Sequence, residues 1–137
     1  MRGAAPVPDA NLARQREVVT AFLAASRSGE FDALLAVLDP DVVLRADSGA
    51  VPPGVPAGAL REVRGARAVA EQALTFSRLA RFSRPALVNG AAGLVTAPGG
   101  KPYAVMGFTV AHGKIVEIDI LADPARLRRL DLAVLDD

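Results

Sequence analysis

The chain has 137 residues, 51% of them hydrophobic, and a formal charge of +1 from 16 basic and 15 acidic side chains. This length fits one domain with its own core, and the balanced charge gives no electrostatic reason to expect nucleic acid or an anionic membrane as a partner. The absence of cysteine excludes disulfides, a thiolate nucleophile and cysteine-ligated zinc, and fits a reducing compartment. No segment has the pattern of a signal peptide or a membrane helix, so we expect a soluble cytoplasmic protein.

Helical periodicity dominates the first third of the chain. Residues 1–11 are rich in proline and small side chains, which predicts a linker or flexible arm before a domain over 12–137. Apolar spacing then predicts a helix with Asn11 as its N-cap and Gly29 as its stop. A second, shorter helix over 31–38 ends at the Asp-Pro step, because the residue before a proline is pushed out of the α region.

The next segments alternate strand, loop and helix. Strands are predicted over 41–47 and, as a short edge strand, over 60–64. The stretch VPPGVPAG between them can be neither helix nor central strand. Its apolar side chains fit a lid over a pocket or a loop that docks on another domain. A helix is predicted over 66–80.

The remainder predicts four antiparallel strands joined by tight turns. Asn89-Gly90 is the strongest two-residue hairpin signal, and His112-Gly113 marks a second turn. The segment PGGK turns the chain between the middle two strands. A last short helix is expected to begin with Asp123 as N-cap and Pro124 at its first position.

This order of elements predicts an α+β fold with helices packed on the concave face of a curved antiparallel sheet. Within 103–111 both alternating sets of side chains are largely apolar. A sheet with one solvated face carries one polar set. We therefore expect the outer face to be covered as well, by a second copy in a homodimer or by another domain.

Three stretches, GEFDALLAVLDPDVVLRAD, VRGARAVAEQAL and GKIVEIDILADP, resemble the SnoaL-like branch of the NTF2-like superfamily over about residues 12–131. The resemblance implies a cone-shaped α+β fold. RPALVNGAAGLVTAPGGKPYAVMGFTV and ADPARLRRLDLAVLD are similar to the SnoaL-like C-terminal extension of extracytoplasmic-function RNA polymerase sigma factors. That extension follows the two sigma regions and tunes sigma activity, so the resemblance implies a regulator that contacts sigma regions or RNA polymerase.

Two motifs of that family map onto this chain with departures. The Asp-Gly-Gly-Gly-Lys motif corresponds to Asp47-Ser48-Gly49-Ala50-Val51, which lacks the Lys, and Asn-Pro-Asp-Lys-Leu corresponds to Asp123-Pro124-Ala125-Arg126-Leu127. The preceding sigma regions are not among the 137 residues, so we expect a separated extension or a free-standing relative. The regulatory contacts that the resemblance implies are Asp47, Ser48, Gly49, Asp123, Pro124 and Leu127.

A second hypothesis is a small-molecule enzyme of the isomerase or polyketide-cyclase type. Relatives place catalytic acids about where Asp47 and Asp119 lie, and an Asp in an apolar pocket is well suited to remove a proton beside a carbonyl. Tyr103, the only tyrosine, would then donate to the developing oxyanion. The competing interpretations are a turn residue for Asp47 and a solvent or interface position for Asp119 and Glu117, which share a strand face. A third hypothesis is a homodimer that binds a small apolar ligand.

Other candidate residues favour ordinary structural roles. His112 lies at a predicted turn and is expected to be exposed, which argues against a catalytic triad or a histidine-ligated metal. Asp39 and Asp41 flank a helix stop and a strand start, where such side chains cap backbone groups. The RLRR cluster over 126–129 is expected to be a solvated helix face. The sequence therefore predicts no metal and no cofactor.

Overall fold

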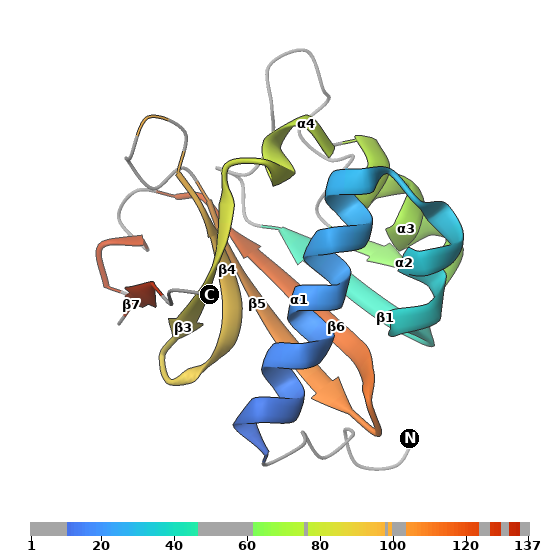
Figure 1. Ribbon diagram of the computed structural model, residues 1–137, viewed down its shortest axis with the longest axis horizontal. Helices are drawn as coiled ribbons and strands as arrows, with labels where there is room; N and C mark the ends of the chain where they lie inside the picture. The colour runs from blue at the N-terminus through green and yellow to red at the C-terminus, as the bar shows by residue number, and fades with distance from the viewer. Residues whose placement is uncertain are drawn as a thin grey trace.

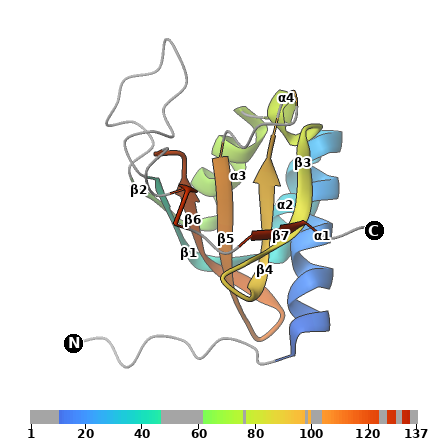
Figure 2. The same cartoon turned by 90° about the vertical axis from the view of Figure 1, so that its left-hand side faces the viewer.

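The computed structural model describes residues 11–46, 62–75, 77–97, 99, 104–123, 127–129 and 132–134. Within these ranges the helices pack on one side of a curved sheet (Figures 1 and 2), which confirms the predicted α+β class. No described helix is both long enough and apolar enough to cross a bilayer. In chain order the elements are α1 (Leu12–Ser28), α2 (Phe31–Val37), β1 (Leu38–Ala46), β2 (Glu62–Arg64), α3 (Ala66–Thr75), α4 (Ser77–Ala80), β3 (Ser83–Val88), β4 (Ala91–Thr96), β5 (Ala104–Ala111), β6 (Lys114–Leu121) and β7 (Leu132–Val134).

The sheet has the order β2-β1-β6-β5-β4-β3-β7. Strands β3 to β6 form the predicted antiparallel meander. The sheet is mixed, because β1 pairs parallel with β6 while β2 and β7 pair antiparallel at the two edges. Parallel pairing requires a crossover connection, and the long path from β1 back to β6 through α3 and the meander supplies it.

Both predicted ends of α1 are confirmed. The side chain of Asn11 accepts a hydrogen bond from the backbone N–H of Arg14 at 3.1 Å, which satisfies one of the free donors of the first turn. Gly29 adopts the left-handed conformation with φ of 70°, and its N–H is directed to the carbonyls of Ala25 and Ser26. The helix therefore has a fixed length along the concave side of the sheet.

One apolar cluster fills the space between the helices and the concave face of the sheet. Helix α1 packs across β3, β4 and β5, whereas α3 covers β1. The side chains that are most completely buried come from all of these layers, as expected for one continuous core. They include Val19, Leu34, Val42, Val69, Leu94, Val110, Ile115 and Ile118.

The two hairpin predictions are confirmed by backbone geometry. Asn89 and Gly90 have φ values of 50° and 86°, and His112 and Gly113 have 55° and 75°. Two successive positive φ values define the type I′ turn, whose twist matches that of the flanking strands.

The first strand differs from its predicted limits, whereas the third helix does not. Strand β1 begins at Leu38, and the Asp39 carboxylate accepts a hydrogen bond from the Asp41 N–H at 2.9 Å, the backbone capping expected of this pair. The helix predicted over 66–80 is confirmed for its described residues, since 66–75 (α3) and 77–80 (α4) are helical. Near the end of α3, the Thr75 hydroxyl donates to the Glu71 carbonyl at 3.0 Å.

The short helix predicted over 123–135 is wrong for its last part. A helical turn is present near Leu127, whose N–H donates to the Asp123 carbonyl at 2.9 Å, but 132–134 form β7. Strand β7 pairs with β3, with Leu132 opposite Val88 and Val134 opposite Ala86. The edge of β3 offers unpaired backbone groups, and satisfying them outweighs the local preference for helix.

Candidate functional site

The predicted site residues divide into those that the structure describes and those that it does not. Asp119, Asp123 and Leu127 lie on β6 or just after it. The remaining predicted residues lie outside the described residues; they are Asp47, Ser48, Gly49, Tyr103 and Pro124. The described part of the candidate site therefore consists of β6 and the segment that follows it.

Asp119 lies on the convex face of the sheet. Its neighbours Ile118 and Ile120 belong to or pack against the core cluster on the concave side, and alternate strand residues point to opposite faces. Across the sheet, Asp119 is paired with Gly107 of β5 and with Arg45 of β1. The carboxylate is thus on the outside of the cone and does not enter the concave interior.

The half of the convex face formed by β2, β1 and β6 carries charges of both signs. Arg45 forms an ion pair with Glu117, and Arg64 pairs with Glu62 at 2.6 Å. The partners lie on neighbouring strands or on the same short strand, so no local pattern in the sequence links Arg45 to Glu117. We call this surface the charged half; it comprises Arg45, Glu62, Arg64, Glu117 and Asp119.

The other half of the convex face, formed by β3, β4 and β5, carries a covered apolar cluster. Ala86, Val95 and Val105 are at most 4% exposed, although they point away from the main core. Leu127 packs against them, held by the helical turn that follows β6. The second cover expected for the sheet therefore comes in part from the C-terminal segment of the same chain.

The described part of the interior contains three buried polar side chains, Ser26, Ser83 and Thr96. The hydroxyls of Ser83 and Thr96 are 2.6 Å apart and hydrogen-bonded, whereas the Ser26 Oγ has no hydrogen-bond partner within the described residues. Arg27, next to Ser26, donates to the carbonyl of Ser83 at 2.6 Å. The Ser83–Thr96 pair therefore lies where the end of α1 meets the start of β3.

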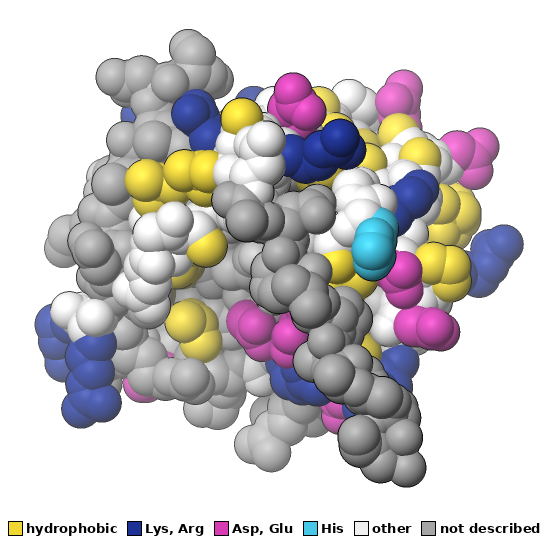
Figure 3. Space-filling view, turned by 90° about the horizontal axis from the view of Figure 1, so that it is seen from below, with side chains coloured by type: hydrophobic (Ala, Val, Ile, Leu, Met, Phe, Trp, Pro, Cys, Tyr) yellow, Lys and Arg dark blue, Asp and Glu magenta, His cyan; other side chains and the backbone are white. Residues whose placement is uncertain are grey.

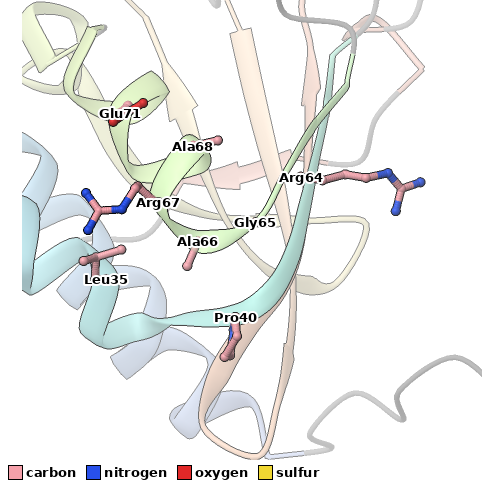
Figure 4. Close-up of a pocket in the computed structure, with 8 residues that line it drawn as sticks. All are labelled: Leu35, Pro40, Arg64, Gly65, Ala66, Arg67, Ala68 and Glu71. Carbon is pink, nitrogen blue, oxygen red and sulfur yellow. The ribbon is translucent and has the colours of Figure 1, made fainter.

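An open depression of about 560 Å³ lies outside the core, where α2, the start of β1 and the first turn of α3 meet. Figure 4 shows the Arg64 side chain directed away from Leu35 and Ala66. The Arg67 guanidinium stacks over the Phe31 ring at 5.4 Å. None of the residues that line the depression was predicted as a site residue; they are Leu35, Pro40, Arg64, Gly65, Ala66, Arg67, Ala68 and Glu71.

His112 is exposed at the β5–β6 turn, as predicted, and its imidazole is visible on the surface in Figure 3. Among the residues that the structure describes, no three His, Cys, Asp or Glu side chains are grouped closely enough to hold a metal ion. A general base must lie within hydrogen-bond reach of its substrate, usually in a pocket, whereas His112 lies at an exposed turn.

Among known proteins, the matches to this chain are solved structures. Neither a protein-family model nor a curated protein sequence matches the chain. The extracytoplasmic function sigma factor SigJ of Mycobacterium tuberculosis matches with a TM-score of 0.66 and 29% identity over 83% of this chain. The match spans 44% of SigJ, so this chain corresponds to less than half of that protein.

Two further solved structures share the architecture at lower identity. An NTF2-like protein of unknown function from Cytophaga hutchinsonii matches 84% of this chain and 95% of its own, with a TM-score of 0.53 and 13% identity. A putative isomerase from Bacillus subtilis matches 82% of this chain and 88% of its own, with a TM-score of 0.56 and 16% identity. At such identities a match shows the fold alone. The chain therefore has the NTF2-like fold, in the SnoaL-like form that its sequence resembles.

Proposed function

We propose that this chain is a SnoaL-like regulatory module that modulates transcription initiation through contact with an extracytoplasmic-function sigma factor. The observation that supports this most strongly is the SigJ match, which combines 29% identity with coverage of 83% of this chain. More than half of SigJ lies outside the match. The contact that we propose is between this chain and the part of a sigma factor that corresponds to this unmatched portion of SigJ. Such a function would place the protein in the cytoplasm.

The charged half of the convex face suits this function. Interfaces between domains resemble transient protein–protein interfaces and are more polar than permanent ones. Arg45 and Glu117 are 48% and 34% exposed, so their charges are accessible to a partner. Asp119 lies on the same face, between Arg45 of β1 and Gly107 of β5 in the register of the sheet.

The isomerase hypothesis has support from the fold only. A shared fold hosts many unrelated functions, and the function must be argued from the site. The described interior contributes Ser26, Ser83 and Thr96 as its buried polar side chains, and Asp119 lies outside the cone. The homodimer and the small apolar ligand expected from the sequence stay predictions, and the mass of the protein in solution tests the first of them.

The regulatory proposal is tested by transcription in vitro. SigJ from which the matching region has been removed is assayed on its own promoter with RNA polymerase, alone and with this chain fused or added separately. We expect a reproducible change in transcript yield, of either sign, that the charge-reversed variant Arg45→Glu with Glu117→Arg diminishes.

The matched control is the Bacillus subtilis putative isomerase, which has the same fold at 16% identity. An equal effect of the control protein would show that any NTF2-like domain perturbs the assay. No change in transcription with the fused and the separate chain would contradict the proposal.

A further inference from the structure

Phe82, in the connection between α4 and β3, exposes an aromatic ring to solvent. It is 38% exposed, and only one other large apolar side chain in the described part of the chain, Leu12 at 37%, is comparably exposed. The guanidinium of Arg81 lies over the ring, 5.0 Å from its centroid. Aromatic and arginine side chains are the types enriched at protein interfaces and at their energetic hot spots.

The backbone on both sides of Phe82 is fixed by hydrogen bonds. Arg27 on α1 donates to the carbonyls of Ala80 at 3.1 Å and Ser83 at 2.6 Å, and the Phe82 carbonyl accepts from the Ala97 N–H at 3.1 Å. Ala80 and Ser83 are themselves buried, at 8% and 4% exposure. The ring is therefore held outward between two anchored residues, so little ordering entropy would oppose binding there.

Arg84 extends the same surface. Ser83 points inward to Thr96, and residues two apart along a strand share a face, so Arg84 lies on the side of Phe82. Arg81, Phe82 and Arg84 are all exposed. We call these three residues the α4–β3 corner; Figure 1 shows this connection beside the C-terminal end of α1.

The corner lies in a part of the sequence that has no acidic residue. From residue 72 to residue 116 the chain contains no Asp or Glu, and its cationic residues there are Arg78, Arg81, Arg84, Lys101 and Lys114. The ion pairs found among the described residues join other side chains, Arg45 with Glu117 and Arg64 with Glu62. The corner therefore belongs to a stretch of the sequence in which every Lys, Arg, Asp or Glu is a cation.

We propose that the α4–β3 corner is a docking surface for an acidic segment of a protein partner. An apolar side chain of that segment would cover the Phe82 ring, and its carboxylates would bind Arg81 and Arg84, since guanidinium groups form strong charge-assisted hydrogen bonds with carboxylates. A nucleic acid is a poorer fit, because its affinity depends on many phosphate contacts and the corner supplies two cations. The inference rests on the proposed function only in taking a sigma factor as the partner.

The test uses the full 137-residue chain and two probes, SigJ without its matching region and a labelled peptide of glutamates with two leucines. The variants are Phe82→Ala and the pair Arg81→Gln with Arg84→Gln. Their matched controls are Leu12→Ala, an equally exposed side chain at the opposite end of α1, and the exposed Arg16→Gln. Far-UV circular dichroism checks that each variant is folded.

We expect each corner variant to weaken binding of both probes at least tenfold, and each control to change it less than twofold. The arginine pair should also flatten the salt dependence of binding, whereas Phe82→Ala should leave it unchanged, because screening acts on charges. Should Phe82→Ala fail to fold, the arginine pair alone decides, since both side chains are exposed.

The possible results separate this inference from the proposed function. Binding of SigJ that the corner variants do not weaken overturns the inference and leaves the proposed function standing. Corner-dependent binding of the peptide without binding of SigJ supports the inference and counts against a sigma-factor partner. Failure of both probes to bind overturns the inference. Corner-dependent binding of a DNA duplex in place of the peptide overturns the assignment of a protein partner.

Discussion

The Phe22 ring on α1 meets the Phe108 ring on β5 edge to face, with ring centroids 5.3 Å apart and ring planes inclined by 65°. Both residues are buried, at 3% and 7% exposure. This geometry brings the positive edge of one ring to the negative face of the other. The contact joins the longest helix to the middle of the sheet, so it should be a principal determinant of stability.

We expect Phe22→Ala to lower the free energy of unfolding by about 3–5 kcal/mol, because it removes buried apolar surface and leaves a cavity. Phe82→Ala is the control, since the same side chain is lost from an exposed position and should cost less than about 1 kcal/mol. Urea unfolding measures both. Equal losses in the two variants would show that the helix–sheet contact does not carry this energy.

Gly93 and Gly107 face each other across β4 and β5 but should differ in how well they tolerate a methyl group. A Cβ at Gly93 would lie 2.5 Å from the Met106 carbonyl oxygen and 2.7 Å from the Val88 Cγ2, whereas a Cβ at Gly107 has nothing within 4 Å. We expect Gly93→Ala to cost about 1–3 kcal/mol of stability from overpacking. Gly107→Ala should change it by no more than about 0.5 kcal/mol. Similar melting temperatures for the two variants would contradict the close approach at Gly93.

Ser26 places a hydroxyl in the core without a hydrogen-bond partner among the described residues. Burying an unpaired polar group is costly, so Ser26→Ala should keep or raise stability, by up to about 1–2 kcal/mol. Ser28→Ala is the matched control on the same helix, because Ser28 is exposed and bonds the Ala24 carbonyl at 2.9 Å. Both changes gain helix propensity, so the difference between them in thermal unfolding reports the buried hydroxyl. A Ser26→Ala variant less stable than the control would indicate a partner for Ser26.

The Arg45–Glu117 ion pair should contribute little to stability, because its side chains are 48% and 34% exposed. A double-mutant cycle with Arg45→Gln and Glu117→Gln should give a coupling of about 0.2–1 kcal/mol that declines as salt is added. The Arg64–Glu62 pair, at 68% and 44% exposed, provides a comparison that should couple more weakly. A coupling that does not depend on salt would mean that a partner or another part of the chain shields the charged half.

Features that depend on a few neighbouring residues were predictable. The Asn11 cap, the Gly29 stop and the two tight hairpin turns were identified correctly, because each depends on backbone preferences that act within about four positions. The shared face of Glu117 and Asp119 also follows from the period of a strand, and the pairing with Thr109 and Gly107 bears it out.

Features that depend on distant residues were not predictable. The segment 132–134 was expected to be helical and became β7, because the free edge of β3 lies beside it in the folded chain. The Arg45–Glu117 pair was also missed, because its members are 72 positions apart.

By itself the sequence determined the kind and order of the elements before β7 and the turns between the meander strands, since local sterics and hydrogen bonding decide these. Tertiary structure alone decided that Asp119 faces outward, that Leu127 covers the apolar half of the convex face and that Phe82 is held exposed. A one-residue change of register moves every side chain of a strand to the other face, and register is set by contacts between strands. The side on which a charged or aromatic group lies is therefore a property of the assembled sheet.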